Sequence, residues 1–307
     1  MLAIIKIGID PVAFSIGALA VHWYGIMYVV AFVVAYYLGA RAHCLPRGIS
    51  RAHIEQITGW TILFGLIGGR LYYDVQTLSL MKSPIDWLAV WQGGMAFYGA
   101  IVLGVGTIIF LGWRWRLPVW VLLDGGAFFA AVGQPIGRIG NIINGDILGG
   151  PSNLPWATAY TNPHAVLQST PQLTYAVCTP AHCQAYQPAG AYEGLATLCI
   201  LAILILMRRR QVRAGVIFIA YVALYSVSQF GLDFLRQSEP VTWAGLKELQ
   251  ITALIAFIFV LPALIVVWRR TAGRPASPAV AQGAEEDGRE EAGTGETIPA
   301  AGDPATT

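Results

Sequence analysis

Long apolar stretches alternate with short polar segments along most of the chain. A helix needs ~20 mostly apolar residues to cross the hydrocarbon core of a bilayer, and seven stretches reach or approach that length. They span residues 14–40, 54–73, 95–113, 117–137, 192–207, 214–235 and 249–268. The pattern therefore predicts an all-α membrane protein with seven transmembrane helices.

Two polar segments interrupt or end this pattern. Residues 147–191, between the fourth and fifth stretches, are rich in Pro, Thr, Asn, Gln and Tyr, which predicts a small cap of short strands and turns. Residues 272–307 consist mainly of Ala, Gly, Glu, Pro and Thr and contain no aromatic residue. Such a composition cannot bury enough apolar surface to fold. We expect a membrane domain over residues 1–271 and a disordered tail over residues 272–307.

Composition supports a membrane protein and argues against nucleic acid as a partner. Hydrophobic residues make up 56% of the 307 residues and charged residues only 12%, with a mean hydropathy of +0.58. The formal net charge of +2 is too small for the basic surface that binds a phosphate backbone.

Basic residues are distributed unevenly over the connecting segments. After the first, third, fifth and seventh stretches lie twelve arginines: Arg41, Arg47, Arg51, Arg114, Arg116, Arg208, Arg209, Arg210, Arg213, Arg269, Arg270 and Arg274. The opposite side has six basic residues: Lys6, Arg70, Lys82, Arg138, Arg236 and Lys247. Basic residues concentrate in cytoplasmic loops, so we expect an extracytoplasmic N-terminus, an outer cap at about 147–191 and a cytoplasmic C-terminus.

The run G-R-I-G-N-I-I-N-G-D at residues 137–146 places a permanent charge at the end of the fourth stretch. A charged side chain at membrane depth costs at least ~2.5–3.5 kcal/mol and usually marks a functional site. The planar fork of Arg138 suits phosphate, and the amides of Asn141 and Asn144 both donate and accept. Gly140 allows backbone to approach a ligand closely. The run predicts a binding site for a lipid phosphate.

Other polar residues in or near the apolar stretches have structural alternatives to a site role. Arg70 can extend to the interface along its aliphatic stem, and Asp124 is more often a hydrogen-bond partner within a bundle than a catalyst. Glu193 can favour the N-terminus of a helix, and Asp233 can pair with Arg236 at i, i+3. An interfacial aromatic belt is a sufficient explanation for Tyr24.

The four cysteines lie in different segments. Cys178 and Cys183, in the expected outer cap, form a disulfide in an oxidising compartment or remain two unpaired thiols, because closeness in sequence does not guarantee the required geometry. Cys44 lies on the expected cytoplasmic side, and Cys199 lies within an apolar stretch, where a small apolar role is expected. No spacing resembles a zinc site.

These residues resemble the motifs of the prolipoprotein diacylglyceryl transferase family. The signature at residues 137–146 is the most specific match. The segments H-W-Y-G-I-M-Y at 22–28, W-Q-G-G-M-A-F at 91–97, Y-E at 192–193 and D-F-L-R at 233–236 resemble the family's first-span, W-x-G-G-M-S-F, H-P-x-x-L-Y-E and E-x-x-R motifs. The resemblance covers residues 10 to 270 in the family's order.

The resemblance implies an activity, partners and site residues. The family resides in the bacterial inner membrane and transfers the diacylglyceryl group of phosphatidylglycerol to the lipobox cysteine of a prolipoprotein signal segment, with release of glycerol phosphate and without a metal or cofactor. The implied catalytic residues are Arg138, Tyr98, Asp146, Glu193 and Asp233. The implied phosphatidylglycerol-binding residues are Arg138, Asn141, Asn144, Gly140, Tyr24, Arg70, Tyr225 and Gln229.

The chain departs from the family pattern at four polar positions. Tyr98 stands where the family has a histidine, Gln229 where it has an arginine, Gln187 where it has another histidine, and Asp146 where the signature ends in glutamate. A phenol with an ordinary pKa of ~10 is a weaker base than an imidazole at neutral pH. Two alternatives to a divergent transferase are a non-catalytic relative that binds anionic lipid or signal segments, and a small-solute or lipid transporter.

Overall fold

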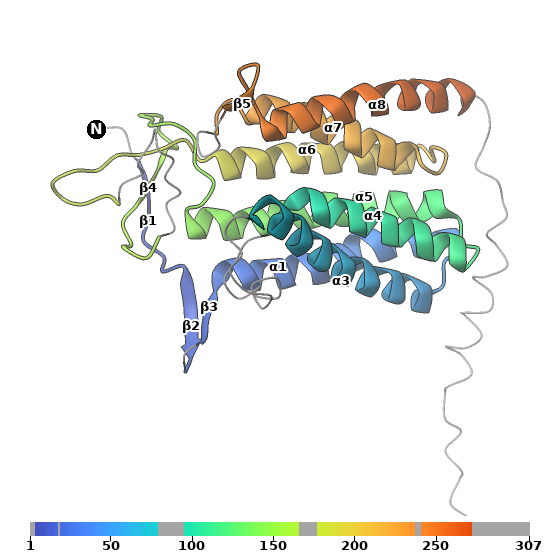
Figure 1. Cartoon of the computed structure of the whole chain (residues 1–307), viewed down its shortest axis with the longest axis horizontal. Helices are drawn as coiled ribbons and strands as arrows, with labels where there is room; N and C mark the ends of the chain where they lie inside the picture. Colours follow the sequence, from blue (N-terminus) through green and yellow to red (C-terminus); the bar gives the residue numbers. More distant parts are fainter. Residues whose placement is uncertain (1–3, 18, 79–94, 166–176, 237–240, 272–307) are drawn as a thin grey trace, which may run out of the picture.

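The computed structural model describes residues 4–17, 19–78, 95–165, 177–236 and 241–271. Most of these residues are helical (Figure 1). The helices are α1 (Trp23–Val34), α2 (Ala42–Cys44), α3 (Arg51–Gln76), α4 (Phe97–Arg114), α5 (Val119–Asn144), α6 (Ala189–Arg209), α7 (Val216–Leu232) and α8 (Glu248–Thr271), with a π-helical segment, Ala35–Arg41, and a 3-10 turn, Leu45–Arg47, on either side of α2. The expected tail at 272–307 lies outside the described residues.

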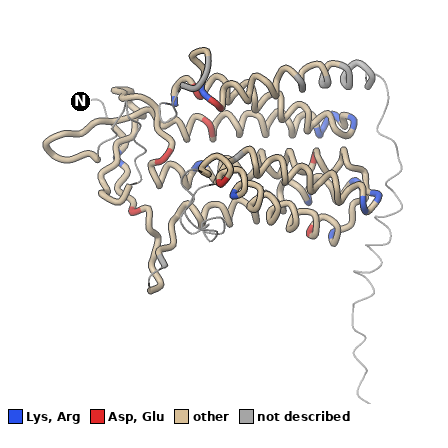
Figure 2. The backbone as a smooth tube through the Cα atoms, in the orientation of Figure 1, with Lys and Arg blue, Asp and Glu red and all other residues tan. Residues whose placement is uncertain are grey.

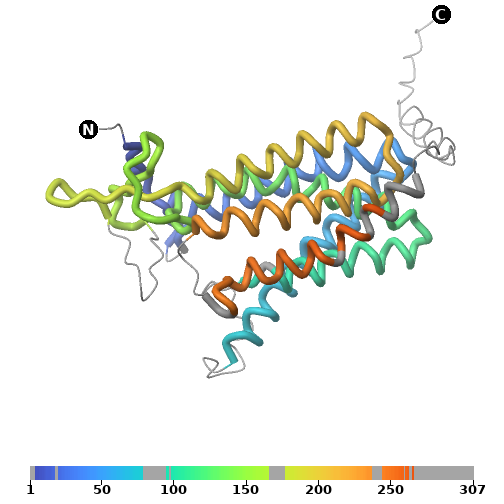
Figure 3. The backbone as a smooth tube through the Cα atoms, turned by 90° about the horizontal axis from the view of Figure 1, so that it is seen from above, coloured from blue at the N-terminus to red at the C-terminus, as the bar shows by residue number. Residues whose placement is uncertain are grey.

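The helices run roughly along one common axis, and short strands gather at one end (Figures 1 and 3). Within the described residues, three continuous helical segments are long and apolar enough to cross a membrane: Trp23–Arg47, Val119–Asn144 and Ala189–Arg209. Three further apolar helices in the described part of the chain are shorter: Tyr98–Arg114, Val216–Leu232 and Glu248–Pro262.

The expected start of the first transmembrane helix, at residue 14, is wrong. Strands β2 (Val12–Ile16) and β3 (Leu19–His22) form an antiparallel hairpin, and the helix begins only at Trp23. Gly17 in the turn has a φ of 61°, a conformation that favours glycine. A short apolar run without charges fits a strand as well as a helix, so hydropathy alone did not reveal the hairpin.

Helix α5 lies at the centre of the bundle and packs against α1, α4, α6 and α7. Its fully buried side chains include Ala127, Phe128 and Ala131, which pack with Ile200 of α6 and Ile217 of α7. Because α5 contacts several helices, side chains from those helices can lie close to the end of α5.

Asp124 of α5 joins that helix to the start of α7. Its carboxylate accepts hydrogen bonds of 2.8 Å from the backbone N–H groups of Gly215 and Phe218. The side chain is only 2% exposed, and it satisfies donors that a helix start leaves free. The interpretation of Asp124 as a hydrogen-bond partner within the bundle is confirmed.

Part of the segment that connects α5 to α6 lies beside the first strand of the chain (Figure 1). Strand β1 (Ile5–Ile7) pairs in parallel with β4 (Thr158–Tyr160), and an isolated bridge joins Pro151 to Tyr186. Cys178 and Cys183 form a disulfide, which settles the choice between a bridge and unpaired thiols. Short strands and turns were expected for this segment.

Among the described residues, the charged ones gather toward the two ends of the bundle, and few lie in its middle (Figure 2). Lys and Arg predominate at the end opposite β1 and β4, where α4 ends in Arg114 and α6 ends in Arg208 and Arg209. Acidic and basic side chains are mixed at the strand-bearing end (Figure 2).

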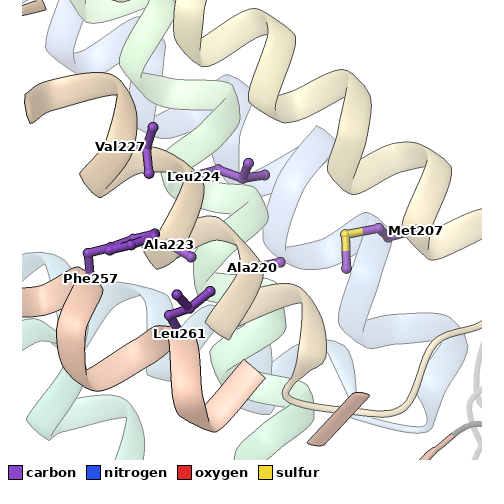
Figure 4. Close-up of a pocket in the computed structure, with 7 residues that line it drawn as sticks. All are labelled: Met207, Ala220, Ala223, Leu224, Val227, Phe257 and Leu261. Carbon is purple, nitrogen blue, oxygen red and sulfur yellow. The ribbon is translucent and has the colours of Figure 1, made fainter. Parts of the chain in front are cut away.

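An open apolar groove of about 300 Å³ lies between α6, α7 and α8 (Figure 4). Its lining contains no polar side chain, and consists of Met207, Ala220, Ala223, Leu224, Val227, Phe257 and Leu261.

The hairpin of β5 (Val241–Trp243) and β6 (Leu246–Lys247) precedes α8.

Candidate functional site

The signature residues form the last turns of α5 and the reversal that follows. The helix continues past its expected end at residue 137 to Asn144, and Gly145 with a φ of 80° closes it by donating its N–H to the carbonyl of Asn141 at 2.8 Å. This left-handed closure is typical of glycine after a helix. It turns Asp146 back so that its two carboxylate oxygens accept from Asn141 Nδ2 at 3.1 and 3.2 Å. Asn144 Nδ2 donates to the same carboxylate at 3.2 Å.

Arg138 joins this turn to α6. Its Nη1 donates to Asn141 Oδ1 at 3.3 Å, and its Nη2 lies 2.5 Å from Glu193 Oε2. The Arg138 side chain is 21% exposed, whereas that of Glu193 is 3% exposed. Glu193 therefore holds the guanidinium from the protein interior, while about a fifth of the Arg138 side chain remains exposed.

Small residues on α6 let α5 approach closely at this point. A Cβ at Gly194 would lie 3.4 Å from Cβ of Arg138, and a Cβ at Gly190 would lie 3.8 Å from Cβ of Asn141. These glycines lie on either side of Glu193, so the carboxylate reaches the guanidinium over a short span. Small residues at helix contacts serve this purpose in membrane bundles.

Two tyrosines border the charged residues. Tyr225 of α7 interacts electrostatically with both Arg138 and Glu193, and Tyr24 of α1 interacts with Asp146 and Arg138. The Tyr24 hydroxyl donates to the Tyr28 hydroxyl at 3.0 Å. Tyr24 therefore lies near enough to Arg138 and Asp146 to interact electrostatically with both.

Gly140 of α5 allows α1 to approach closely at Tyr24 and Met27. A Cβ at this position would lie 3.2 Å from the Cα of Tyr24 and 3.2 Å from the Cβ of Met27. Its role in the structure is therefore close helix packing, which brings Tyr24 to the signature.

Asp233 adds a second buried carboxylate beside Glu193. It ends α7, is 2% exposed, and interacts electrostatically with Lys247, Arg236 and Glu193. The backbone bridge from Gly149 to Arg236 ties this end of α7 to the segment that follows the signature.

Gln229 lies one turn before Asp233 on the same helix and is 8% exposed. Its backbone carbonyl accepts from the N–H of Asp233 at 3.0 Å. The spacing of four residues places Tyr225, Gln229 and Asp233 on one face of α7.

Arg70 and Tyr98 belong to the packed pair of α3 and α4. Arg70 Nε lies 3.0 Å from Asp74 Oδ1, with side-chain exposures of 7% and 0%, and its guanidinium lies over the ring of Tyr73. Arg70 is therefore buried beside Asp74 rather than extended into solvent. Tyr98 packs edge-on against Tyr72, with ring centroids 6.4 Å apart. The residues before it in the W-Q-G-G motif, 91–94, lie outside the described residues.

Three residues near these groups were not identified as site residues from the sequence. Tyr28 holds the Tyr24 hydroxyl, Asp74 neutralises Arg70, and Lys247 reaches the end of α7. The i, i+4 spacings of Tyr28 and Asp74 from their partners were a usable signal. Lys247 lies 14 residues from Asp233, so sequence spacing gave no such signal.

Asp146 is the one carboxylate of the signature at residues 137–146. Burial raises the pKa of the Asp146 carboxyl above its ordinary range, and hydrogen bonds from Asn141 and Asn144 act in the opposite direction. A carboxylate with a raised pKa is a better proton acceptor at neutral pH. The arrangement thus combines the Arg138 guanidinium with a nearby carboxylate of raised pKa. The described residues contain no group of three or more His, Cys, Asp or Glu that could hold a metal ion.

Comparison with known proteins gives one consistent result. Residues 11–269 match the family model described as prolipoprotein diacylglyceryl transferase. The chain is similar to three proteins named phosphatidylglycerol–prolipoprotein diacylglyceryl transferase. The protein from Lactobacillus acidophilus is 30% identical over 88% of this chain and 93% of its own length. The protein from Rhodococcus jostii is 32% identical over 84% and 73%, and that from Sinorhizobium medicae is 30% identical over 88% and 94%.

Proposed function

The chain belongs to the prolipoprotein diacylglyceryl transferase family, and we propose that it transfers the diacylglyceryl group of phosphatidylglycerol to the lipobox cysteine of prolipoproteins. The observation that carries this proposal is the position of Arg138, whose guanidinium is held by Glu193 and Asn141 and whose side chain is partly exposed. The names of the similar proteins specify both substrates. They do not favour the transporter or the non-catalytic alternative.

The reaction replaces a carbon–oxygen bond by a carbon–sulfur bond. The cysteine thiol loses its proton to a base, the sulfur attacks a glycerol carbon, and the bonding electrons leave with the phosphate oxygen as glycerol phosphate. A cation at the phosphate stabilises the negative charge that develops there. Arg138 is our candidate for that cation, since a bidentate fork matches phosphate geometry.

Asp146 is our candidate for the base. The Asn141 and Asn144 amides fix both of its oxygens, and a thiol with an ordinary pKa of ~8.5 needs an acceptor to form a thiolate. Tyr98, Glu193 and Asp233 are the other candidates for proton transfer. We propose that the lipid headgroup is bound or bordered by Tyr24, Tyr225, Gln229, Asn141, Asn144 and Arg70. Gly140 contributes by the close helix packing that brings Tyr24 to the signature.

The proposal includes a topology of seven spans in the bacterial inner membrane. The N-terminus lies outside, the segment at about 147–191 forms an outer cap, and the C-terminus lies in the cytoplasm. The concentration of Lys and Arg at one end of the bundle (Figure 2) supports this orientation, because basic residues favour the cytoplasmic side.

Complementation tests the function in cells. A bacterium depleted of its own transferase should regain growth and lipid-modified prolipoproteins when it expresses this chain, but not when it expresses Arg138→Met/Glu193→Gln, which removes both charges of the ion pair. A correctly inserted wild-type chain that restores neither would contradict the proposal.

A further inference from the structure

Three carboxylates are linked, directly or through a neighbour, to the single arginine of the signature. Glu193 is ion-paired with Arg138, Asp146 is linked to it through Asn141, and Asp233 interacts electrostatically with Glu193. An anionic lipid headgroup must approach this group. Because like charges repel strongly where water is excluded, further positive charge is needed on the side of Asp233.

The Asp233 carboxylate is buried but accepts no hydrogen bond from the described residues. It is 2% exposed, and such a charge is costly unless opposite charge compensates it. In the described part of the chain, the charged groups that face it are Lys247 of β6, Arg236 after α7, and Glu193 of α6. Two of these three are cations.

Lys247 is held in place by hydrogen bonds rather than extended into solvent. Its Nζ donates to the backbone carbonyls of Asp233 and Arg236 at the end of α7, where the helix dipole favours a cation. Its backbone N–H donates to Gln250 Oε1 at 3.0 Å. Gln250 is 1% exposed, and its Nε2 donates in turn to the carbonyl of Phe230 at 3.5 Å.

We propose that Lys247 is a positioning residue for diacylglyceryl transfer, which acts through Asp233 by compensating its charge beside Glu193. The inference rests on the proposed function. With Lys247 in place, Glu193 remains free to hold Arg138, and Asp233 stays ionised near the headgroup. Without the positive charge, the two neighbouring carboxylates repel each other and one takes up a proton at higher pH.

Two substitutions separate the charge of Lys247 from its hydrogen bonds. Lys247→Gln keeps a donor for the carbonyls and removes the charge, whereas Lys247→Arg keeps the charge. With purified enzyme, phosphatidylglycerol and a lipobox peptide, we expect Lys247→Gln to lower kcat/KM about tenfold and to move the acid limb of the pH profile up by roughly one unit. Lys247→Arg should keep the limb in place. Lys6→Gln on β1, which interacts with none of these carboxylates in the described structure, is the matched control.

A double variant tests whether Lys247 acts through Asp233. Asp233→Asn/Lys247→Gln removes both charges, so it should fold even where Lys247→Gln alone does not. It should be no less active than Asp233→Asn. A further tenfold loss in the double variant would overturn the inference, as would equal losses in Lys247→Gln and Lys247→Arg with an unchanged pH profile. Absence of product from the wild type would instead contradict the proposed function itself.

Discussion

Removing the ion pair between Arg138 and Glu193 as a unit separates its structural role from its proposed role in the reaction. Arg138→Ala alone leaves the Glu193 carboxylate, 3% exposed, without its cation. Breaking a buried pair in this way costs ~3–5 kcal/mol of stability. Loss of activity in that variant would therefore not distinguish misfolding from a lost phosphate contact.

The double variant Arg138→Met/Glu193→Gln removes both charges and keeps similar volumes. Replacing both partners of a buried pair is often close to neutral for stability, so we expect a thermal midpoint near that of the wild type. Transfer should still fall by ~10²–10³-fold, the typical effect of losing one group that stabilises developing charge.

A matched control uses the ion pair of Arg51 and Glu55, in which Arg51 Nε lies 2.8 Å from Glu55 Oε1. Their side chains are 52% and 48% exposed. Exposed pairs contribute only ~0–1 kcal/mol, so Arg51→Met/Glu55→Gln should change neither stability nor activity. The assay measures thioether formation on a lipobox peptide beside a thermal unfolding curve. A folded Arg138→Met/Glu193→Gln variant with wild-type activity would refute the role of Arg138.

Three further results are expected. Asp124→Ala should lower the free energy of unfolding in detergent by ~2 kcal/mol, because two backbone N–H groups at the start of α7 lose their acceptor. A variant as stable as the wild type would contradict this expectation. Cys178→Ser/Cys183→Ser should cost about 2 kcal/mol by the loop-closure relation, and addition of reductant should lower the thermal midpoint of the wild type but not of the variant. If Asp146 is the base, kcat/KM should rise with pH through a limb above the ordinary carboxyl pKa of ~3.9, because burial raises the pKa of Asp146. A limb that approaches ~10 would point to Tyr98 instead.

Hydropathy identified where the helices lie but not every boundary. The expected segments 54–73 and 95–113 agree closely with α3 and α4. The first segment began nine residues too early, at residue 14 rather than Trp23, because residues 12–22 are as apolar as the helix that follows. Their strand pairing depends on a turn at Gly17, which average hydropathy does not detect.

The local part of the site was readable, whereas its long-range contacts were not. Arg138, Asn141 and Asp146 lie within nine residues, so helix geometry and one glycine turn bring them together. Glu193 was recognised as a candidate, but its pairing with Arg138 depends on how α5 and α6 pack. Lys247 reaches Asp233 through a hairpin, and no periodicity connects residues across such a turn.

Product formation by the purified wild-type chain tests the central claim most directly. Incubation with phosphatidylglycerol and a lipobox peptide should give a peptide whose cysteine sulfur carries a diacylglyceryl group, with an equal amount of glycerol phosphate released, both detected by mass spectrometry. A folded protein that binds phosphatidylglycerol but forms no thioether, with a peptide that a related transferase modifies in parallel, would contradict the account.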